Sequence, residues 1–489
     1  MLRKVLTVFV ATFALGAFIA AMPQDASAQK PKKKARRLAR QADKMFNQRR
    51  YEEALQKYGE AVAISPIFPR ARFFKGYSHY NLGQYPLAIE EFNRALAQGY
   101  KRLDVVSVRM EAYLQNKDYS AARADAMTAV NLKPKTAYYH SFLGRMSVLT
   151  GDYQAGVASL ERAISLGERN ADTHYFLAVA YASSGQLDEQ RAAAQEALRR
   201  ATSYAANSWY LVADSQAKSR LFEEAAQSYT NAINAYIREI ETNRKTVDTD
   251  RYLYQSYSDL ADVYRNLNRF DDAVTAAKGG LGVRPDDGLL HISLAWYYSL
   301  AGRTPEAILA GQKAVQLMPN EYMAHTNLCR AYIDQGEILY KQDKINQANQ
   351  YFNNANTTCK RALSLEPGDG ETNYYLGRSY FYLDNEGLSN SYYKKSVPGL
   401  VKFTNENPDY SDGFYLLGNA YFATGDNKNA IKAYEDCLRI APRFARVRYN
   451  LGFVYIKEGD LDNARTQQEK LKELDQDLAD RLAKLIAGE

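Results

Sequence analysis

Four of the five histidines in this 489-residue chain recur at a fixed spacing. The interval from His140 to His174 is the same as the interval from His291 to His325. Histidine is a frequent zinc ligand, but a zinc site needs several ligand atoms about 2 Å from one ion. Equivalent positions on packed helices are about 10 Å apart. We therefore expect these histidines to be packing residues, and we expect no metal site and no cofactor.

The patterns of the common enzyme classes are missing from the sequence. There is no Gly-rich phosphate loop ending in Gly-Lys-Ser/Thr, no His-Glu-x-x-His, no Cys-x-x-Cys and no Gly-x-Ser-x-Gly. Ser215 and Lys218 match a Ser-x-x-Lys pattern, but the partner motifs Ser-Asp-Asn and Lys-Thr-Gly are absent. We therefore do not expect an enzyme.

The elements that hold these residues follow a period of 34. Alanine closes a short turn signature at Ala54, Ala88 and Ala122, which are spaced by this same period. Hydrophobic residues make up 46% of the chain and charged residues 24%, which suits a folded soluble protein. A period of this length predicts an array of helical repeats, in which function lies on a stacked surface and not in one pocket.

Each period contains two amphipathic helices. In the period from Ala137 the first helix has its inward-facing residues at i, i+3, i+4 and i+7, and the second at i, i+4 and i+7. These residues are His140, Leu143, Gly144 and Ser147, then Gly156, Leu160 and Ala163. A proline stops the second helix in many units. These prolines are Pro66, Pro134, Pro285, Pro319, Pro367 and Pro442.

The residues of one late period show a family pattern most clearly. Its order is Leu-Gly-x-x-Tyr, then small and aromatic residues, then proline: Leu417, Gly418, Tyr421, Ala430, Tyr434 and Pro442. This order resembles the tetratricopeptide repeat. The resemblance implies an all-α, right-handed superhelical solenoid of about twelve helix-turn-helix units. The units begin at residues 35, 69, 103, 137, 171, 206, 254, 288, 322, 370, 411 and 445.

The repeats predict the organisation of the chain. We expect a signal peptide at 1–28 and a basic leader at 29–34. Two repeat blocks follow at 35–239 and 254–474, with a polar insertion or linker between them at 240–253. A capping helix is expected at 475–489, with Leu478, Leu482 and Leu485 on one face. The units at 322–410 are enlarged. Pro398 lies within a predicted second helix, and we expect it to kink or break that helix.

Three cysteines have different expected states. In the repeat register Cys329 and Cys359 face each other across the enlarged hairpin, so they form either a disulfide or a pair of buried thiols. Cys437 is expected to be buried and unpaired.

The resemblance also implies a binding surface. In tetratricopeptide arrays the fifth and ninth positions of the first helix line the concave groove, and here aromatic residues and arginine dominate those positions. The predicted partner-binding residues are Tyr77, Arg145, Tyr175, Tyr210, Trp296, Arg330, Tyr374, Arg378, Tyr415, Asn419, Tyr449 and Phe453. Such side chains anchor protein partners. The chain is therefore predicted to be a non-enzymatic scaffold that holds an extended peptide or protein, and replacing Tyr374 and Arg378 by alanine is expected to weaken partner capture.

The N-terminus carries a targeting signal. Arg3 and Lys4 precede an apolar run at 5–22, and Ala26-Ser27-Ala28 supplies the small residues that signal peptidase needs, so cleavage is expected between Ala28 and Gln29. This predicts a periplasmic or secreted protein. The alternative is an uncleaved membrane anchor, because more positive charge follows the apolar run than precedes it.

The basic residues between Lys30 and Arg40 suggest a second function. They are the main source of the chain's net charge of +7. In the alternative to the groove hypothesis, the protein is an envelope-assembly factor that docks on an anionic membrane surface through Lys30 to Arg40. Specific binding of nucleic acid is not expected.

Overall fold

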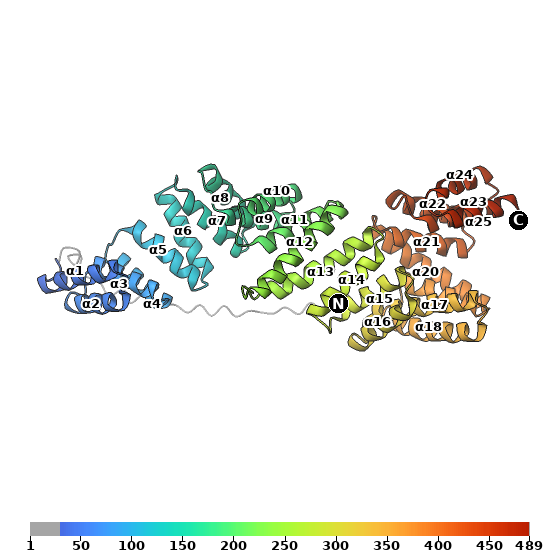
Figure 1. The fold of residues 1–489 in the computed structure, drawn as a ribbon, viewed down its shortest axis with the longest axis horizontal. Helices are drawn as coiled ribbons and strands as arrows, with labels where there is room; N and C mark the ends of the chain where they lie inside the picture. Colours follow the sequence, from blue (N-terminus) through green and yellow to red (C-terminus); the bar gives the residue numbers. More distant parts are fainter. Residues whose placement is uncertain (1–29, 489) are drawn as a thin grey trace. The chain divides into compact units, whose positions relative to one another are not determined.

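The computed structural model describes residues 30–488 and shows them as a series of α-helices (Figure 1). Within these residues there are 25 helices and no strand. They form twelve consecutive pairs and one final helix, which confirms the predicted all-helical array with its C-terminal capping helix. The predicted signal peptide, residues 1–28, lies outside the described residues.

The helices divide into two compact units, the first ending at Leu211 and the second beginning at Val212, inside α11 (Ala205–Lys218). Unit 1 contains α1 (Lys33–Asn47), α2 (Tyr51–Ile64), α3 (Pro69–Asn81), α4 (Tyr85–Ala97), α5 (Arg102–Gln115), α6 (Tyr119–Leu132), α7 (Ala137–Leu149), α8 (Tyr153–Ser165), α9 (Ala171–Ser183) and α10 (Leu187–Arg199). Unit 2 contains α12 (Phe222–Glu241), α13 (Thr249–Asn266), α14 (Phe270–Val283), α15 (Gly288–Leu300), α16 (Thr304–Leu317), α17 (Tyr322–Lys341), α18 (Ile345–Leu365), α19 (Gly370–Tyr382), α20 (Glu386–Glu406), α21 (Ser411–Ala423), α22 (Asn427–Ile440), α23 (Ala445–Lys457), α24 (Leu461–Lys472) and α25 (Gln476–Ala487).

The structure gives finer bounds for two predicted segments. The basic leader expected at 29–34 is partly helical, because α1 begins at Lys33. The polar segment 240–253 belongs to unit 2, and α12 and α13 are longer than their neighbours and extend into it from both sides. Only residues 242–248 lie between those two helices.

Small residues let the two helices of each pair approach closely. The periodic alanines Ala54, Ala88 and Ala122 are all 0% exposed. At Gly144 of α7 a Cβ would lie 2.5 Å from the Leu160 Cγ of α8, closer than carbon atoms can pack. Because interiors are close-packed, a larger side chain at such a position would push the pair apart.

The odd-numbered helices line the inner side of each unit. Some first helices of successive repeats contact one another directly, as α7 does with α9 and α15 with α17. Each first helix also packs against the second helix of its own repeat. Side chains on the free side of the first helices therefore face one shared inner surface within each unit.

Pro398 does not break its helix, so the expected break does not occur. Helix α20 is continuous through it. The next residue explains the local packing: a Cβ on Gly399 would lie 2.4 Å from the carbonyl oxygen of Gly368. The backbone of α20 thus rests directly on the residues that precede α19, and the buried neighbours Ser396 and Leu400 hold it there. This tertiary packing compensates for the hydrogen bond that proline cannot donate.

The last helix covers the end of the array. Leu482 and Ala479 of α25 are buried, and Leu482 packs against Gly452 of α23, where a Cβ would lie 2.5 Å from it. Among residues 30–488 no helix is both long enough and apolar enough to cross a membrane.

Candidate functional site

The predicted groove residues all lie on first helices, but they are not equally accessible. Tyr374 is only 6% exposed and belongs to the core of unit 2, where its ring lies 5.6 Å from that of Tyr393 on α20. The expectation that Tyr374 faces an open groove is therefore wrong, because α20 covers it. The other residues of the predicted set are half-buried: Tyr77, Arg145, Tyr175, Tyr210, Trp296, Arg330, Arg378, Tyr415, Asn419, Tyr449 and Phe453.

The two predicted arginines of the enlarged repeats are paired within the chain. An Nη nitrogen of Arg330 on α17 lies 3.3 Å from a carboxylate oxygen of Glu371 on α19. Arg378 on α19 likewise pairs with Glu337 on α17: its Nη2 donates a hydrogen bond to Oε2 at 2.8 Å, and its Nε lies 2.6 Å from Oε1. These pairs tie two first helices together across the inner surface. They also satisfy the charges that were expected to meet a partner.

Aromatic rings enclose Arg330. Its guanidinium carbon lies 5.7 Å from the ring centre of Trp296 and 5.8 Å from that of Tyr375. A guanidinium over an aromatic face is attracted by the ring quadrupole, most strongly over tryptophan. Trp296 is therefore already engaged by a cation of its own unit.

The segment between α20 and α21, residues 407–410, crosses the inner surface of unit 2. The ring of Tyr410 lies 6.2 Å from Trp296 on α15, and Arg265 on α13 stacks over both rings, at 5.6 Å from Tyr410 and 5.0 Å from Trp296. The neighbouring Asp409 forms an ion pair with Arg220 at 3.4 Å. Residues from distant repeats thus meet here, and the chain itself covers the surface that Trp296 was predicted to offer.

Four carboxyl groups near this cluster have raised pKa values. Burial raises the pKa of Glu371 to about 7, although Arg330 partly opposes the shift. Burial also raises the pKa values of Asp334, Glu337 and Asp412 above the usual range. The side chain of Glu371 keeps 36% of its surface exposed, so protein atoms surround most of it while part of it still contacts solvent. Burial on the inner surface of unit 2 thus raises the pKa of all four carboxyl groups, and that of Glu371 lies near neutral pH.

Unit 1 contains an arginine that, unlike Arg330 and Arg378, is not paired with a carboxylate in the part of the chain that the structure describes. Arg145 on α7 is half-buried, and its guanidinium carbon lies 5.1 Å from the ring centre of Phe176 on α9. It makes no ion pair with any carboxylate among residues 30–488, and its buried Nε has no hydrogen-bond partner there. On the preceding first helix, in contrast, Arg109 pairs with Asp125 at 2.7 Å. Arg145 therefore differs from Arg330 and Arg378 in having no carboxylate partner among the described residues.

A row of aromatic rings lies at the start of unit 1. The ring centre of Phe46 on α1 is 5.3 Å from that of Tyr77 on α3, and Tyr77 is 6.1 Å from Tyr80. All three side chains are half-buried. Aromatic side chains give a partner a large contact area at little conformational cost. Of the three, only Tyr77 was predicted. Phe46 and Tyr80 both occupy the twelfth position of their repeats, so an alignment of the repeats would show an aromatic residue recurring at this position.

The predicted residues of the last repeats mostly contact neighbouring helices. Asn419 accepts hydrogen bonds from Tyr434 at 2.7 Å and from Asn450 at 3.0 Å, so its amide oxygen is in use. The aromatic residues have neighbours of their own. Tyr415 lies 5.3 Å from Phe444, Tyr449 lies under Arg481 at 5.1 Å, and Phe453 lies 5.7 Å from Phe422. In unit 1, Tyr175 stacks on Tyr204 at 4.3 Å.

The repeated histidines have a structural role that the spacing alone did not reveal. Three of them contact the carbonyl oxygen of the proline six residues before, in the turn that ends the preceding helix. The pairs are His140 with Pro134 at 2.9 Å, and His291 with Pro285 and His325 with Pro319, both at 3.0 Å. Arginines make the same contact in other repeats, as Arg72 does with Pro66. Among the described residues no three His, Cys, Asp or Glu side chains gather as metal ligands.

The cysteines fall into two states. Cys329 on α17 and Cys359 on α18 form a disulfide, with their sulfur atoms 2.01 Å apart and both residues fully buried. Cys437 on α22 is free and buried, and burial raises the pKa of its thiol. The bond joins the two helices of the enlarged repeat.

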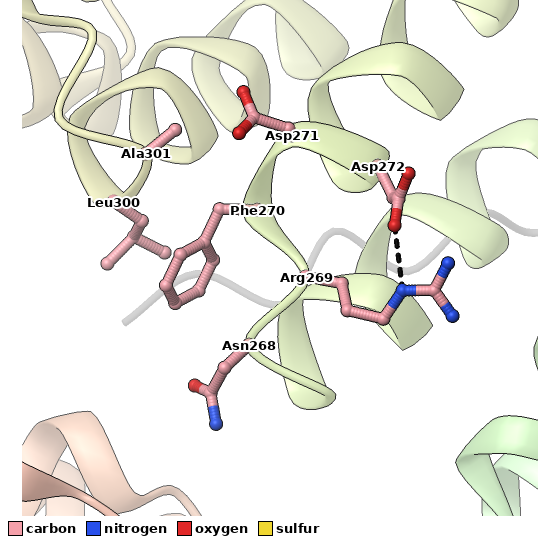
Figure 2. Close-up of a pocket in the computed structure, with 7 residues that line it drawn as sticks. All are labelled: Asn268, Arg269, Phe270, Asp271, Asp272, Leu300 and Ala301. Carbon is pink, nitrogen blue, oxygen red and sulfur yellow. Dashed lines mark hydrogen bonds and ion pairs between the residues drawn. The ribbon is translucent and has the colours of Figure 1, made fainter. Parts of the chain in front are cut away.

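A pocket of about 350 Å³ lies at the turns of unit 2, between the ends of α13 and α15 (Figure 2). Its charged groups are matched within the chain: Arg269 turns toward Asp272 at 2.7 Å, and Asp271 pairs with Arg303 at 3.5 Å. None of the predicted groove residues lines it. Its geometry does not suggest a ligand.

Comparison with known proteins gives the family. A tetratricopeptide repeat model matches residues 40–100, 150–206 and 258–322. Two further models of the repeat match residues 418–459 and 445–478. The matched stretches fall on helix pairs in both units. The chain is a tetratricopeptide repeat protein.

Relatives of this repeat protein are distant. The TPR repeat-containing protein MJ1428 of Methanocaldococcus jannaschii is 21% identical over 457 residues, which cover 87% of this chain and 67% of that protein. The anaphase-promoting complex subunit cut9 of Schizosaccharomyces pombe is 25% identical over 29% of this chain and 22% of its own length. A UDP-N-acetylglucosamine–peptide N-acetylglucosaminyltransferase of Giardia intestinalis is 33% identical over 17% of this chain, but only 6% of that enzyme is matched.

The solved structures that resemble this chain also have low sequence identity to it. The crystal structure of the Cut9–Hcn1 complex is 15% identical with a TM-score of 0.35, and covers 93% of this chain and 96% of that one. A thermophilic tetratricopeptide repeat protein of Thermus thermophilus is 19% identical with a TM-score of 0.34, and covers 42% of this chain and 99% of that one.

Proposed function

We propose that this tetratricopeptide repeat protein is a non-enzymatic scaffold that binds an extended peptide or protein partner on the inner surface of unit 1. The observation that carries this proposal is the contrast between the arginines of the two units. Arg330 and Arg378 are neutralised by carboxylates of their own unit, whereas Arg145 has no carboxylate partner in the described chain. The repeats bind protein partners in other members of the family, which supports the same proposal.

The chemistry of unit 1 defines the partner. A guanidinium held over an aromatic face takes a carboxylate with two parallel hydrogen bonds. The row of Phe46, Tyr77 and Tyr80 offers apolar contact on the same series of first helices. The partner should therefore carry an acidic side chain together with apolar or aromatic residues.

A peptide-display experiment tests the location. Selection of a random peptide library on the immobilised full chain should enrich acidic peptides with aromatic or aliphatic residues. Arg145→Glu should abolish this enrichment because it places a like charge at the anchoring point. The matched control is Arg162→Glu in the second helix of the same repeat, where the side chain is exposed and the enrichment should persist. Equal enrichment by both variants would place the binding surface elsewhere.

We also propose that the protein is exported and that cleavage leaves Gln29 as its first residue. The support comes from the signal pattern of residues 1–28 and from the disulfide between Cys329 and Cys359, since such bonds persist in oxidising compartments. N-terminal sequencing of the protein from a fractionated producing cell tests this. A chain that begins at Gln29 outside the cytoplasm is the expected result, and a chain that retains residues 1–28 would favour the anchored alternative.

A further inference from the structure

Helix α1 presents a continuous row of positive charge. Its apolar residues face the core, where Ala35, Leu38, Ala39 and Ala42 are all buried. The opposite side carries cations at intervals of three or four residues, which places them on one helical face. All are exposed: Lys33, Arg36, Arg37, Arg40 and Lys44. We call these five residues the basic face of α1.

The basic face has no counter-charge within the described chain. None of its five side chains forms an ion pair with a carboxylate of residues 30–488. The one acidic residue of α1, Asp43, points to other partners: it pairs with Arg70 at 3.1 Å and accepts a hydrogen bond from the Tyr58 hydroxyl at 2.7 Å. The charge of the basic face is therefore directed only at solvent.

Capping the end of the array does not explain this charge. A terminal repeat needs a polar outer face, and α25 provides one at the other end of the chain. Its charged residues balance, with Asp477 and Asp480 against Arg481 and Lys484. Helix α1 contains six Lys or Arg and one Asp. A terminal helix can therefore be kept in contact with water by a mixture of positive and negative side chains. The excess of positive charge on α1 indicates a negatively charged partner.

We propose that the basic face of α1 docks the protein on an anionic phospholipid surface. Its cations are fixed in a row about 16 Å long, at 1.5 Å per residue, on a helix that is anchored to α2. A row of this kind fits a plane of negative headgroups. It contains no aromatic residue that would stack on nucleic acid bases.

Vesicle co-sedimentation of the full chain tests the proposal. We expect binding to vesicles that contain phosphatidylglycerol, weak binding to phosphatidylcholine alone, and release as salt increases. Arg36→Glu with Arg37→Glu and Arg40→Glu should lower the partition onto phosphatidylglycerol vesicles by more than about a hundredfold. Loss of three cations at about 1 kcal/mol each already gives that factor, and the new carboxylates are repelled by the headgroups. The same three positions changed to Lys should keep binding, because charge and not guanidinium geometry is required.

A charge-matched control separates the basic face from net charge. Lys470→Glu, Arg481→Glu and Lys484→Glu change the net charge equally at the far end of the chain, on exposed positions, and should leave binding intact. Circular dichroism checks that both variants keep their helices. The proposal is overturned if the α1 variant binds like the parent chain, if phosphatidylcholine binds equally well, or if the chain binds duplex RNA but no vesicle.

Discussion

At the residue scale, Glu371 makes the stability of unit 2 depend on pH. Its folded pKa of about 7 lies above the ordinary value of 4.5, so the folded chain binds its proton more tightly than the unfolded chain does. The stabilisation is complete below pH 4.5 and is lost as the pH rises to about 7. Glu371→Gln has no proton to lose and should show a smaller fall in urea midpoint over this range.

A second acid serves as the control for this measurement. Glu306 is half-buried beside Arg303, whose hydrogen bond lowers the pKa of the Glu306 carboxyl. Glu306→Gln therefore removes no raised pKa and should leave the fall in midpoint between about pH 5 and about pH 8 unchanged. If Glu371→Gln behaves like Glu306→Gln, the acid network on the inner surface of unit 2 is not as we describe it.

Tyr374 gives a second prediction at this scale. Because its ring is buried against Tyr393, Tyr374→Ala leaves a cavity and should lower the free energy of unfolding by about 3 kcal/mol or more. Tyr449→Ala, at a half-buried position on α23, should cost clearly less. Denaturant unfolding of both variants is the measurement, and equal losses would contradict the burial of Tyr374. Any loss of partner capture by Tyr374→Ala would reflect unfolding and not a lost contact.

The sequence specified which residues face inward but not which of them are accessible. The repeat register placed Arg330, Tyr374 and Arg378 on first helices, as the structure shows. Accessibility depends on pairs such as Arg330 with Glu371, which belong to different repeats, and on Tyr410 reaching Trp296 from a distant repeat. These contacts depend on how tightly successive repeats curve, which the sequence period does not determine.

At the scale of the element, α20 shows where a local rule fails. Proline within a helix usually breaks it, yet α20 is continuous because its backbone packs on the residues before α19. Gly399→Ala should therefore destabilise the protein, since the new Cβ would lie 2.4 Å from the carbonyl oxygen of Gly368. In the same helix Gly387 has no atom within 4 Å of a Cβ, so Gly387→Ala should be neutral or stabilising by up to about 1 kcal/mol.

Thermal unfolding of the two glycine variants measures this difference. The expected order of melting temperature is Gly387→Ala at or above the parent chain and Gly399→Ala well below it. A Gly399→Ala variant as stable as the parent would mean that α20 does not approach Gly368 closely. Neither outcome follows from the sequence, because both glycines have the same helix propensity and differ only in their tertiary neighbours.

Helix boundaries were predictable where the repeat signal is strong. Small residues, turn positions and closing prolines recur from one period to the next, and the twelve pairs follow from them. The start of α1 was predicted to within two residues, because the repeat register begins at residue 35 and α1 begins at Lys33. Lys33 and Lys34 were expected to belong to the basic leader. Helix formation there depends on Ala35, Leu38 and Ala39 packing against α2, which is a tertiary effect.

At the scale of the whole molecule, the two units differ in what they leave available to a partner. Unit 2 pairs Arg330 and Arg378 with carboxylates and joins the helices of its enlarged repeat with a disulfide. Unit 1 keeps an arginine without a carboxylate and a row of half-buried aromatic rings. The predicted partner-binding residues lie in both units, and of these two surfaces we propose the inner surface of unit 1.

Site-specific photo-crosslinking in producing cells tests this central claim most directly. A benzophenone side chain replaces Tyr77 on the inner surface in one variant and Leu87, which is 48% exposed on the second helix of the same repeat, in the other. We predict a discrete crosslinked partner from position 77 that disappears when Arg145→Glu is added, and none from position 87. Identical crosslinking patterns from the two positions, or a partner captured from position 77 regardless of Arg145, would contradict the proposed site.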